Sequence, residues 1–291
     1  MQPKLSPRFE EFLREKQYVM NVSPSTLRWY GQALRWFPSE HPTQPEVQEM
    51  VIRMRLKGLK DTAVNSYMTC FNAYLHWDSA TDRPCGAGCT HPRLKKLKTA
   101  QVVMPTFTDE QVRMLIRWKP QNKYDRRVHT LMLFMLDTGC RISEALTATV
   151  RYIDFDNLLV TLDGKGRKQR IVPFSVDLRR ALYRHVKETE LGPYDRVFGT
   201  SRGTLWDRHN VIDWVKRTCR KLGFEPPART LHAFRHTFAL NYLRRGGSTF
   251  HLQKSLGHST LDMTRRYANL TTEDLQAVHP RISLLKPNWR E

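Results

Sequence analysis

Six side chains between residues 141 and 267 are of the types that can catalyse a reaction at a phosphate group. They are two arginines, one lysine, two histidines and a tyrosine: Arg141, Lys165, His232, Arg235, His258 and Tyr267. A phosphodiester resists nucleophiles because it is negatively charged, and attack adds further negative charge to its nonbridging oxygens. Guanidinium groups bind such oxygens through two parallel hydrogen bonds and stay charged at any working pH. This set of residue types therefore indicates chemistry on a phosphodiester.

Tyr267 is the candidate nucleophile of this set. A free tyrosine has a pKa of about 10, so attack at neutral pH requires help with losing the proton. A cationic site lowers the pKa of a tyrosine, and a nearby histidine can accept the proton. A covalent link between enzyme and substrate would follow.

Each residue also has an ordinary structural interpretation. An arginine after a helix and a glycine is usually a surface or capping residue, and a lysine on a turn is usually solvated. His232 and His236 have the i,i+4 spacing of a metalloprotease zinc helix. However, Ala233 stands where that motif carries its glutamate, and Arg235 would place a positive charge beside the metal. We therefore predict no zinc site at these histidines.

The charge of the whole chain points to a polyanionic partner. Lys and Arg number 48 against 28 Asp and Glu, which gives a net charge of +20 and a pI near 10.1. DNA and RNA are the commonest polyanions that such proteins bind, although a merely basic protein is the alternative. The longest apolar run, residues 131–136, is too short to cross a bilayer, and residues 1–15 contain no apolar segment of a signal peptide. We expect a cytoplasmic protein without membrane contact.

Residues 1–80 are predicted to form a small helical domain. Ser23 can cap a helix that begins at Pro24, and apolar residues then recur at helical spacing. Similar apolar stripes follow at residues 47–54 and 64–75, the last after a possible cap at Asp61. On the first of these helices, Arg28 and Arg35 are candidates for contacts with phosphates. A solvated surface with a half-buried Trp29 is an equally good interpretation.

Residues 81–105 are predicted to be a basic interdomain linker. Prolines and glycines interrupt the periodicity, and four cations follow in a run: Arg93, Lys95, Lys96 and Lys98. They are candidate contacts with a phosphate backbone, and a plain solvated linker is the alternative. Cys85, Cys89 and His91 could bind zinc together with His76, but the spacing is not that of a standard site. We expect the chain's five scattered cysteines to be free thiols.

Residues 106–291 are predicted to form a second domain. Thr108 and Gln111 have the form of a capping box, and residues 128–136 have the composition of a buried helix that Gly139 interrupts. Residues 158–162 and 169–173 resemble two strands around a turn at 163–166, and helix returns from about residue 178 onward. The predicted fold is mainly α with a small antiparallel β-hairpin or sheet.

Taken together, the motifs resemble those of the tyrosine recombinases, the phage-integrase and Xer-type enzymes. The resemblance rests on Arg141 within Thr-Gly-Cys-Arg-Ile-Ser-Glu-Ala-Leu, Lys165 within Gly-Lys-Gly, His232-x-x-Arg235, Leu-Gly-His258 and Tyr267 nine residues later. It is close over residues 106–270 and looser over the first domain. It implies that the first domain is a core-binding (SAM-like) DNA-binding domain and that the second is catalytic.

The resemblance also implies a role for each site residue. Arg141 and Arg235 would bind the phosphate, His258 would donate a hydrogen bond to it, and His232 would accept the Tyr267 proton. Lys165 would protonate the leaving 5′-oxygen, and Glu144 would support the cationic cluster. Tyr267 would form a 3′-phosphotyrosine intermediate, and neither a metal nor a nucleotide cofactor would be needed.

The expected partner is double-stranded DNA with an inverted-repeat site. Family resemblance implies a homo-tetramer that joins two duplexes, exchanges strands through a Holliday junction and can use accessory DNA-bending proteins at the nucleoid. A short helix predicted at residues 273–278 could dock onto its own domain or onto a neighbouring protomer. A type IB topoisomerase and a catalytically idle DNA-binding protein are the alternatives, and the recognised DNA sequence and biological role stay open.

Overall fold

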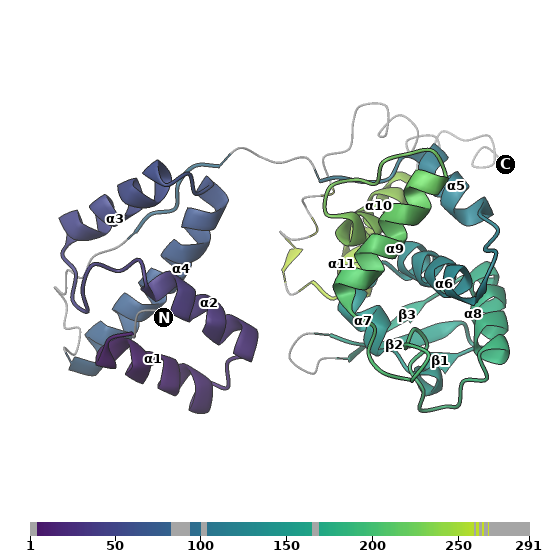
Figure 1. Ribbon diagram of the computed structural model, residues 1–291, viewed down its shortest axis with the longest axis horizontal. Coiled ribbons are helices and arrows are strands. Elements are labelled where there is room, and N and C mark those ends of the chain that lie inside the picture. Colours follow the sequence, from purple (N-terminus) through teal and green to yellow (C-terminus); the bar gives the residue numbers. More distant parts are fainter. Residues whose placement is uncertain are drawn as a thin grey trace, which may run out of the picture. The chain divides into compact units, whose positions relative to one another are not determined.

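Helices make up most of the described part of the chain, and a single small sheet accompanies them there (Figure 1). The computed structural model describes residues 5–82, 94–99, 104–164 and 169–258, together with residues 260, 261, 264 and 267. The chain divides into two compact units, Met1–Val102 and Val103–Glu291. The predicted fold class, mainly α with a small antiparallel sheet, is confirmed.

The N-terminal unit contains four helices: α1 (Pro7–Tyr18), α2 (Pro24–Leu34), α3 (Gln44–Leu56) and α4 (Asp61–Asp82). Ser23 caps α2 as predicted, since its side chain accepts a hydrogen bond from the backbone N–H of Thr26. Helix α1 was not predicted from the sequence. This helix contributes Phe9 and Phe12, whose rings lie 4.9 and 5.4 Å from the ring of Tyr74. Edge-to-face aromatic packing therefore fills the centre of the unit.

The segment 94–99 is held against α4. Leu94 is buried and Leu97 is partly buried against the helical core, and Asn72 and Asn65 bind the backbone of these two leucines. The three lysines predicted to contact phosphates, Lys95, Lys96 and Lys98, are exposed to solvent. A chain anchored through its leucines thus presents its lysines to solvent. Arg93, Cys85, Cys89 and His91 lie outside the described residues.

In the C-terminal unit, helices precede and follow the three strands along the sequence. The helices are α5 (Asp109–Arg117), α6 (Lys123–Thr138), α7 (Ile142–Thr147), η1 (Val150–Tyr152), α8 (Val176–Glu188), α9 (Arg208–Lys221), α10 (Thr230–Arg244) and α11 (Thr249–Leu256). The strands are β1 (Ile153–Asp154), β2 (Leu159–Asp163) and β3 (Gln169–Pro173). The predicted capping box of α5 is present, with Thr108 and Gln111 bonded reciprocally.

The sheet has the order β1-β2-β3, and both pairs are antiparallel. The predicted hairpin is confirmed as β2 and β3, with Val160 opposite Val172. Strand β1, whose Ile153 pairs with Val160, was not predicted from the sequence. The hairpin brings Gly164 and Gln169 to one end of the sheet, and Lys165 follows Gly164 outside the described residues.

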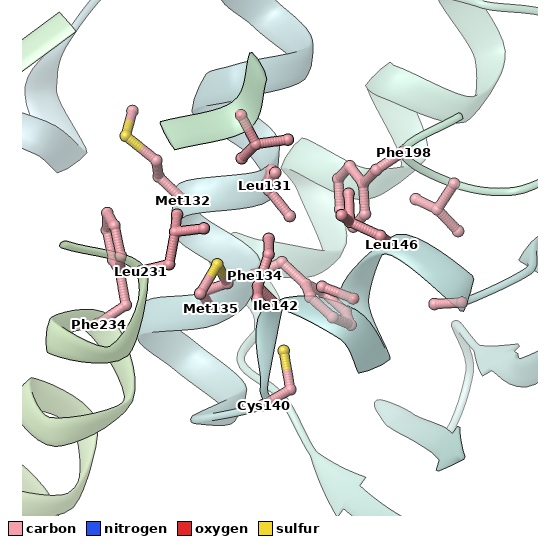
Figure 2. Packing of buried hydrophobic residues seen from close by; sticks show 14 of the residues in the cluster. Leu131, Met132, Phe134, Met135, Cys140, Ile142, Leu146, Phe198, Leu231 and Phe234 are labelled. Atoms are coloured by element: carbon pink, nitrogen blue, oxygen red, sulfur yellow. The ribbon is translucent and has the colours of Figure 1, made fainter. Parts of the chain in front are cut away.

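Helix α6 is the centre of the C-terminal unit, where it packs against α5, α8, α9 and α10 (Figure 1). Figure 2 shows its apolar side chains, among them Leu131 and Phe134, beside Ile142 of α7 and Phe234 of α10. Four helices surround α6, and a helix that is buried on most sides is apolar around most of its circumference. This explains the nearly continuous apolar run at residues 128–136. Helices α7 and α10 thus share one core with α6, whereas Tyr267 packs with α10 and α11 in a separate apolar cluster.

Gly139 ends α6 in the left-handed conformation, with φ of +62°. A Cβ at this position would lie 2.3 Å from the side chain of Phe238 on α10. Only glycine satisfies both the backbone conformation and this close approach. The chain therefore turns sharply here and delivers Arg141 to the start of α7.

The prediction of helix from residue 178 onward is wrong for residues 189–207. This stretch runs as turns, with a bridge between Thr149 and Arg196 and with Phe198 and Trp206 buried in the core. Gly192 and Pro193 lie in it, and neither favours a helix interior. Its buried apolar residues are the adjacent pair Val197 and Phe198 and then Trp206, a spacing without helical periodicity.

Candidate active site

Arg235 occupies the centre of the candidate site. Its side chain comes from the buried face of α10 and is 4% exposed. Two of its guanidinium N–H groups donate to the carbonyl oxygens of Gly139 (2.9 Å) and Leu256 (2.7 Å). Burial, and then the charge of Arg141, lower the pKa of Arg235 to about 10, which still leaves it protonated at neutral pH. Arg235 is thus a fixed cation that ties together the ends of α6 and α11.

Arg141 precedes the first turn of α7 and is held by Glu144. The backbone N–H of Arg141 donates to one carboxylate oxygen at 2.7 Å, and its guanidinium donates to the other at 2.9 Å. The Arg141 side chain remains 32% exposed, whereas that of Glu144 is 3% exposed. Glu144 therefore orients Arg141 from the inside and leaves its outer side open to a ligand.

Arg170 of β3 completes this cluster, and it was not identified from the sequence. Its two terminal nitrogens bind the two oxygens of Glu144 at 2.8 and 2.7 Å, and its Nε donates to the carbonyl of Ser255 at 2.8 Å. Burial alone would raise the pKa of Glu144, but the hydrogen bonds from Arg170 and Arg141 outweigh it and lower that pKa. One carboxylate among three guanidiniums leaves the cluster with a net positive charge. Such a cluster favours an anion.

His258 follows the end of α11, where Gly257 adopts the left-handed conformation with φ of +64°. The Nδ1 of His258 is hydrogen-bonded to the hydroxyl of Thr264 at 2.9 Å. Burial and the charges of the nearby arginines, Arg235 first, lower the pKa of His258 to about 4. The imidazole is therefore neutral at pH 7 in the absence of an added anion.

Tyr267 lies within this group and is 7% exposed. Its ring packs with buried apolar residues of α10 and α11 and lies nearly parallel to the ring of His258, with 6.4 Å between centroids. Its hydroxyl is hydrogen-bonded to Nδ1 of His236 at 2.8 Å. From the sequence, His236 was considered only as a zinc ligand, although its position one helical turn after His232 indicated a shared face.

Among the described members of the set, His232 is exposed to solvent. It lies on the first turns of α10, and its ring is 6.4 Å from that of His236 with an angle of 27° between the planes. Burial and the charges of four arginines, Arg208 and Arg229 ahead of the others, lower the pKa of His232. A neutral imidazole can accept a proton, so His232 retains the property that its predicted role as a base requires.

Five of the six predicted catalytic residues are thus close enough to influence one another. The charge of Arg141 lowers the pKa of Arg235, His232 and His258. Lys165 lies outside the described residues. The predicted DNA contacts Arg28 and Arg35 lie on α2 and at its C-cap, in the other unit, and both are accessible to solvent. Trp29 is partly buried against the helical core.

The described residues include no group of three His, Cys, Asp or Glu side chains that could hold a metal ion. Three of the cysteines, Cys70, Cys140 and Cys219, are free and buried. Within the described ranges, no helix is long and apolar enough to cross a membrane.

Comparisons with known proteins show the family and the fold of this chain. Residues 105–274 match the phage integrase family. The chain is similar to tyrosine recombinase XerA of Pyrococcus furiosus, with 28% identity over 271 residues that cover 91% of this chain and 90% of that protein. Its fold is similar to that of the XerH site-specific recombinase in a post-cleavage complex with palindromic difH substrate (TM-score 0.73, 17% identity, covering 97% of this chain and 84% of that one). It is also similar to the Tn1549 transposon integrase in complex with transposon right end DNA (TM-score 0.72, 20% identity, covering 94% and 99%).

Proposed function

We propose a reaction for this chain from the premise that it belongs to the phage integrase family and is a tyrosine recombinase, an enzyme of site-specific DNA recombination that breaks and rejoins DNA strands. In this reaction the Tyr267 oxygen bonds to the phosphorus of a DNA phosphodiester and the 5′-oxygen leaves. The product is a 3′-phosphotyrosine link, which the 5′-hydroxyl of a second strand attacks in turn. The observation that best supports this proposal is the buried Tyr267 side chain, whose charge would act on Arg235 of the net cationic arginine cluster.

The arginines would bind the phosphate. Attack creates a transition state with more negative charge on the nonbridging oxygens than the ground state carries, so fixed cations lower the barrier. Arg235 is already desolvated and oriented by two carbonyl oxygens, and Arg141 is oriented by Glu144. Little reorganisation is then needed when the phosphate arrives, which is the condition under which such cations catalyse best.

Two protons must move for the bonds to balance. We assign His232 as the acceptor of the Tyr267 proton and Lys165 as the donor of a proton to the leaving 5′-oxygen, following the family resemblance. His258 would donate a hydrogen bond to the phosphate from its Nε2, because Nδ1 is bonded to Thr264. Glu144 and Arg170 would act through Arg141 rather than on the DNA.

The proposed reaction requires neither metal nor ATP. The phosphotyrosine link keeps the free energy of the broken phosphodiester, so a 5′-hydroxyl can reverse the step. Exchange of one strand for another then changes the number and type of bonds very little. Positive charge that a metal would otherwise supply comes from Arg141 and Arg235.

The proposed partner is double-stranded DNA, with inverted half-sites and a tetramer that exchanges strands through a Holliday junction. Support comes from the net charge of +20 and from similar structures that hold DNA, such as the XerH and Tn1549 integrase complexes. The solvent-accessible lysines at positions 95, 96 and 98 would contact phosphates, as would Arg28, Arg35 and Arg93. Accessory DNA-bending proteins are compatible with this assembly.

A capture experiment tests the proposal and identifies the DNA site at the same time. The full chain is incubated with genomic DNA fragments that carry random nicks, and protein–DNA adducts are isolated under denaturing conditions and sequenced. Nicks downstream of the cleavage position release a short strand and trap the covalent link. We expect adducts at a defined inverted repeat for the wild-type protein and none for Tyr267→Phe. Adducts formed by Tyr267→Phe would refute the assignment of the nucleophile.

Plasmids that carry the recovered site distinguish recombination from topoisomerase activity. A tyrosine recombinase should join two sites and produce recombinant circles only from two-site plasmids. Relaxation of a one-site plasmid without recombinants from the two-site plasmid would instead indicate a type IB topoisomerase. No adduct from any fragment would indicate an idle DNA-binding protein.

A further inference from the structure

The Tyr267 hydroxyl is hydrogen-bonded to His236, a residue to which the proposed reaction assigns no role. Their atoms Nδ1 and Oη are 2.8 Å apart, and the two ring centroids are 5.6 Å apart with the planes tilted by 47°. Tyr267 is 7% exposed and His236 is half-buried, so water competes weakly for this bond.

His236 is also adjacent to the phosphate-binding arginine on one rigid helix. Arg235 and His236 are consecutive residues in the middle of α10, and Arg235 fastens this helix to the ends of α6 and α11. The residue that would bind the phosphate and the residue that holds the nucleophile are therefore set at a constant spacing. Because attack requires the reacting atoms at near-contact distance and in line, such a fixed spacing favours the reaction.

The protonation state of His236 permits a specific hydrogen-bond arrangement. Burial, and then the charges of His232, Arg235 and Arg229, lower the pKa of His236 to about 4, so the ring is neutral at pH 7. A neutral imidazole carries its hydrogen on one nitrogen. With that hydrogen on Nδ1, His236 donates to the Tyr267 oxygen. In this arrangement His236 does not take up the hydroxyl hydrogen of Tyr267.

We propose that His236 is a positioning residue for the nucleophile. Its Nδ1–H donates to the Tyr267 oxygen, directs that oxygen toward the phosphate bound by Arg235, and stabilises the negative charge that develops when the proton leaves to His232. His232 lies one turn earlier on α10, with its ring facing that of His236. This inference rests on the proposed function, since it assumes that Tyr267 attacks DNA.

Two substitutions separate this role from packing and from proton transfer. Asparagine places its side-chain amide near the position of Nδ1, so His236→Asn can keep the hydrogen bond without a titratable group. His236→Phe keeps the ring and removes the bond, and His236→Gln carries its amide one bond further, near the position of Nε2. His251→Asn, at an exposed position on α11, serves as the matched control.

The measurement is the first-order rate of covalent adduct formation at saturating nicked DNA, using the site recovered by the capture experiment. We expect His236→Phe and His236→Gln to be about 10- to 100-fold slower than wild type, the range expected when a reacting group loses its orientation. His236→Asn should recover most of the wild-type rate, and DNA affinity should be unchanged in all variants. If His236→Phe does not fold, the proposal is tested by comparing the adduct-formation rates of His236→Asn and His236→Gln. A wild-type rate for His236→Phe, or equal slowness of Asn and Gln, would overturn the proposal.

A substrate with sulfur at the bridging 5′ position locates the defect. A thiolate leaves without protonation, because its pKa of about 8.5 lies far below that of an alcohol. Lys165→Ala should therefore regain activity on this substrate, whereas His236→Phe should stay slow. Recovery of His236→Phe would place His236 at the leaving group and refute its role at Tyr267. A wild-type protein that forms no adduct would instead overturn the proposed function, and this inference with it.

Discussion

Replacing Arg170 by methionine should destabilise the C-terminal unit strongly, although Arg170 has no proposed contact with DNA. The change removes both hydrogen bonds from Arg170 to Glu144 and the bond to the carbonyl of Ser255. The Glu144 and Arg170 side chains are 3% and 11% exposed, so the carboxylate would stay buried with only Arg141 as its partner.

The magnitude follows from the cost of leaving a buried charge incompletely paired. Removing one partner of a buried ion pair typically costs about 3–5 kcal/mol of unfolding free energy. Because Arg141 still binds the carboxylate, we expect the lower end, about 3 kcal/mol. A domain of this size loses about 2–4 °C of melting temperature per kcal/mol, which predicts a decrease of about 6–12 °C.

Differential scanning calorimetry of the full chain can follow the transition of the C-terminal unit. The control is Arg180→Met, because the Arg180–Asp177 pair is 75% and 90% exposed and should contribute little. The double variant Arg170→Met/Glu144→Gln should regain part of the loss, since it removes the unpaired charge. A decrease for Arg170→Met no larger than that for Arg180→Met would refute the reasoning.

The pH dependence provides a second measurement on the same variant. The folded pKa of Glu144 lies below its ordinary value of 4.5, so its contribution to stability is present above that pH and is lost as the pH falls through the folded pKa. Without Arg170, burial dominates and the carboxyl group protonates at a higher pH. The stability difference between wild type and Arg170→Met should therefore shrink as the pH falls from the raised pKa of Glu144 in the variant to its lowered pKa in the wild-type protein.

Three further predictions concern other parts of the C-terminal unit. Gly139→Ala should lower the unfolding free energy by more than Gly203→Ala in urea titrations, because both have positive φ but only Gly139 has a neighbour within 4 Å of the added Cβ. Arg141→Lys should keep DNA affinity in gel-shift assays yet lose most adduct formation, because a point charge does not reproduce the planar fork; near-normal rates would contradict its role at the phosphate. The pKa of folded His258 is about 4, below the ordinary 6.5, so stability should fall as the pH falls from about 6.5 to 4, and His258→Asn should reduce this dependence in thermal melts.

Local signals in the sequence predicted those parts of the fold that local interactions decide. The capping box at Thr108, the N-cap at Ser23 and the hairpin strands all depend on neighbours within a few residues or on a simple period. Helix α1 was not predicted because its apolar face consists mainly of two phenylalanines among charged residues. Strand β1 was not predicted because two residues are too few to show an alternating pattern. The strand forms through pairing with β2, where Ile153 lies opposite Val160.

The candidate site shows the same division between local and tertiary information. The predicted catalytic residues carry recognisable local motifs, so the family resemblance could propose them. Arg170 has no such motif of its own in the chain: an arginine on a strand is ordinarily solvated, and its partner Glu144 lies 26 residues away. His236 had the correct spacing to share a face with His232, but its contact with Tyr267 joins residues 31 positions apart and depends on the tertiary fold. Sequence spacing could therefore indicate the helix face on which His236 lies, but not that this face contacts Tyr267.

The connections within the site span long stretches of chain, and this has a consequence during protein synthesis. Arg235 bonds to Gly139 across 96 residues, Arg170 to Ser255 across 85, and Tyr267 to His236 across 31. A nascent chain that ends before residue 267 lacks one partner of the Tyr267–His236 contact. Residue 267 must therefore leave the ribosome before the whole site can assemble. Contacts of such separation also form late in folding, because the chain must first close large loops. A polypeptide from which residue 267 has not yet emerged is basic enough to bind nearby nucleic acid but lacks the assembled site.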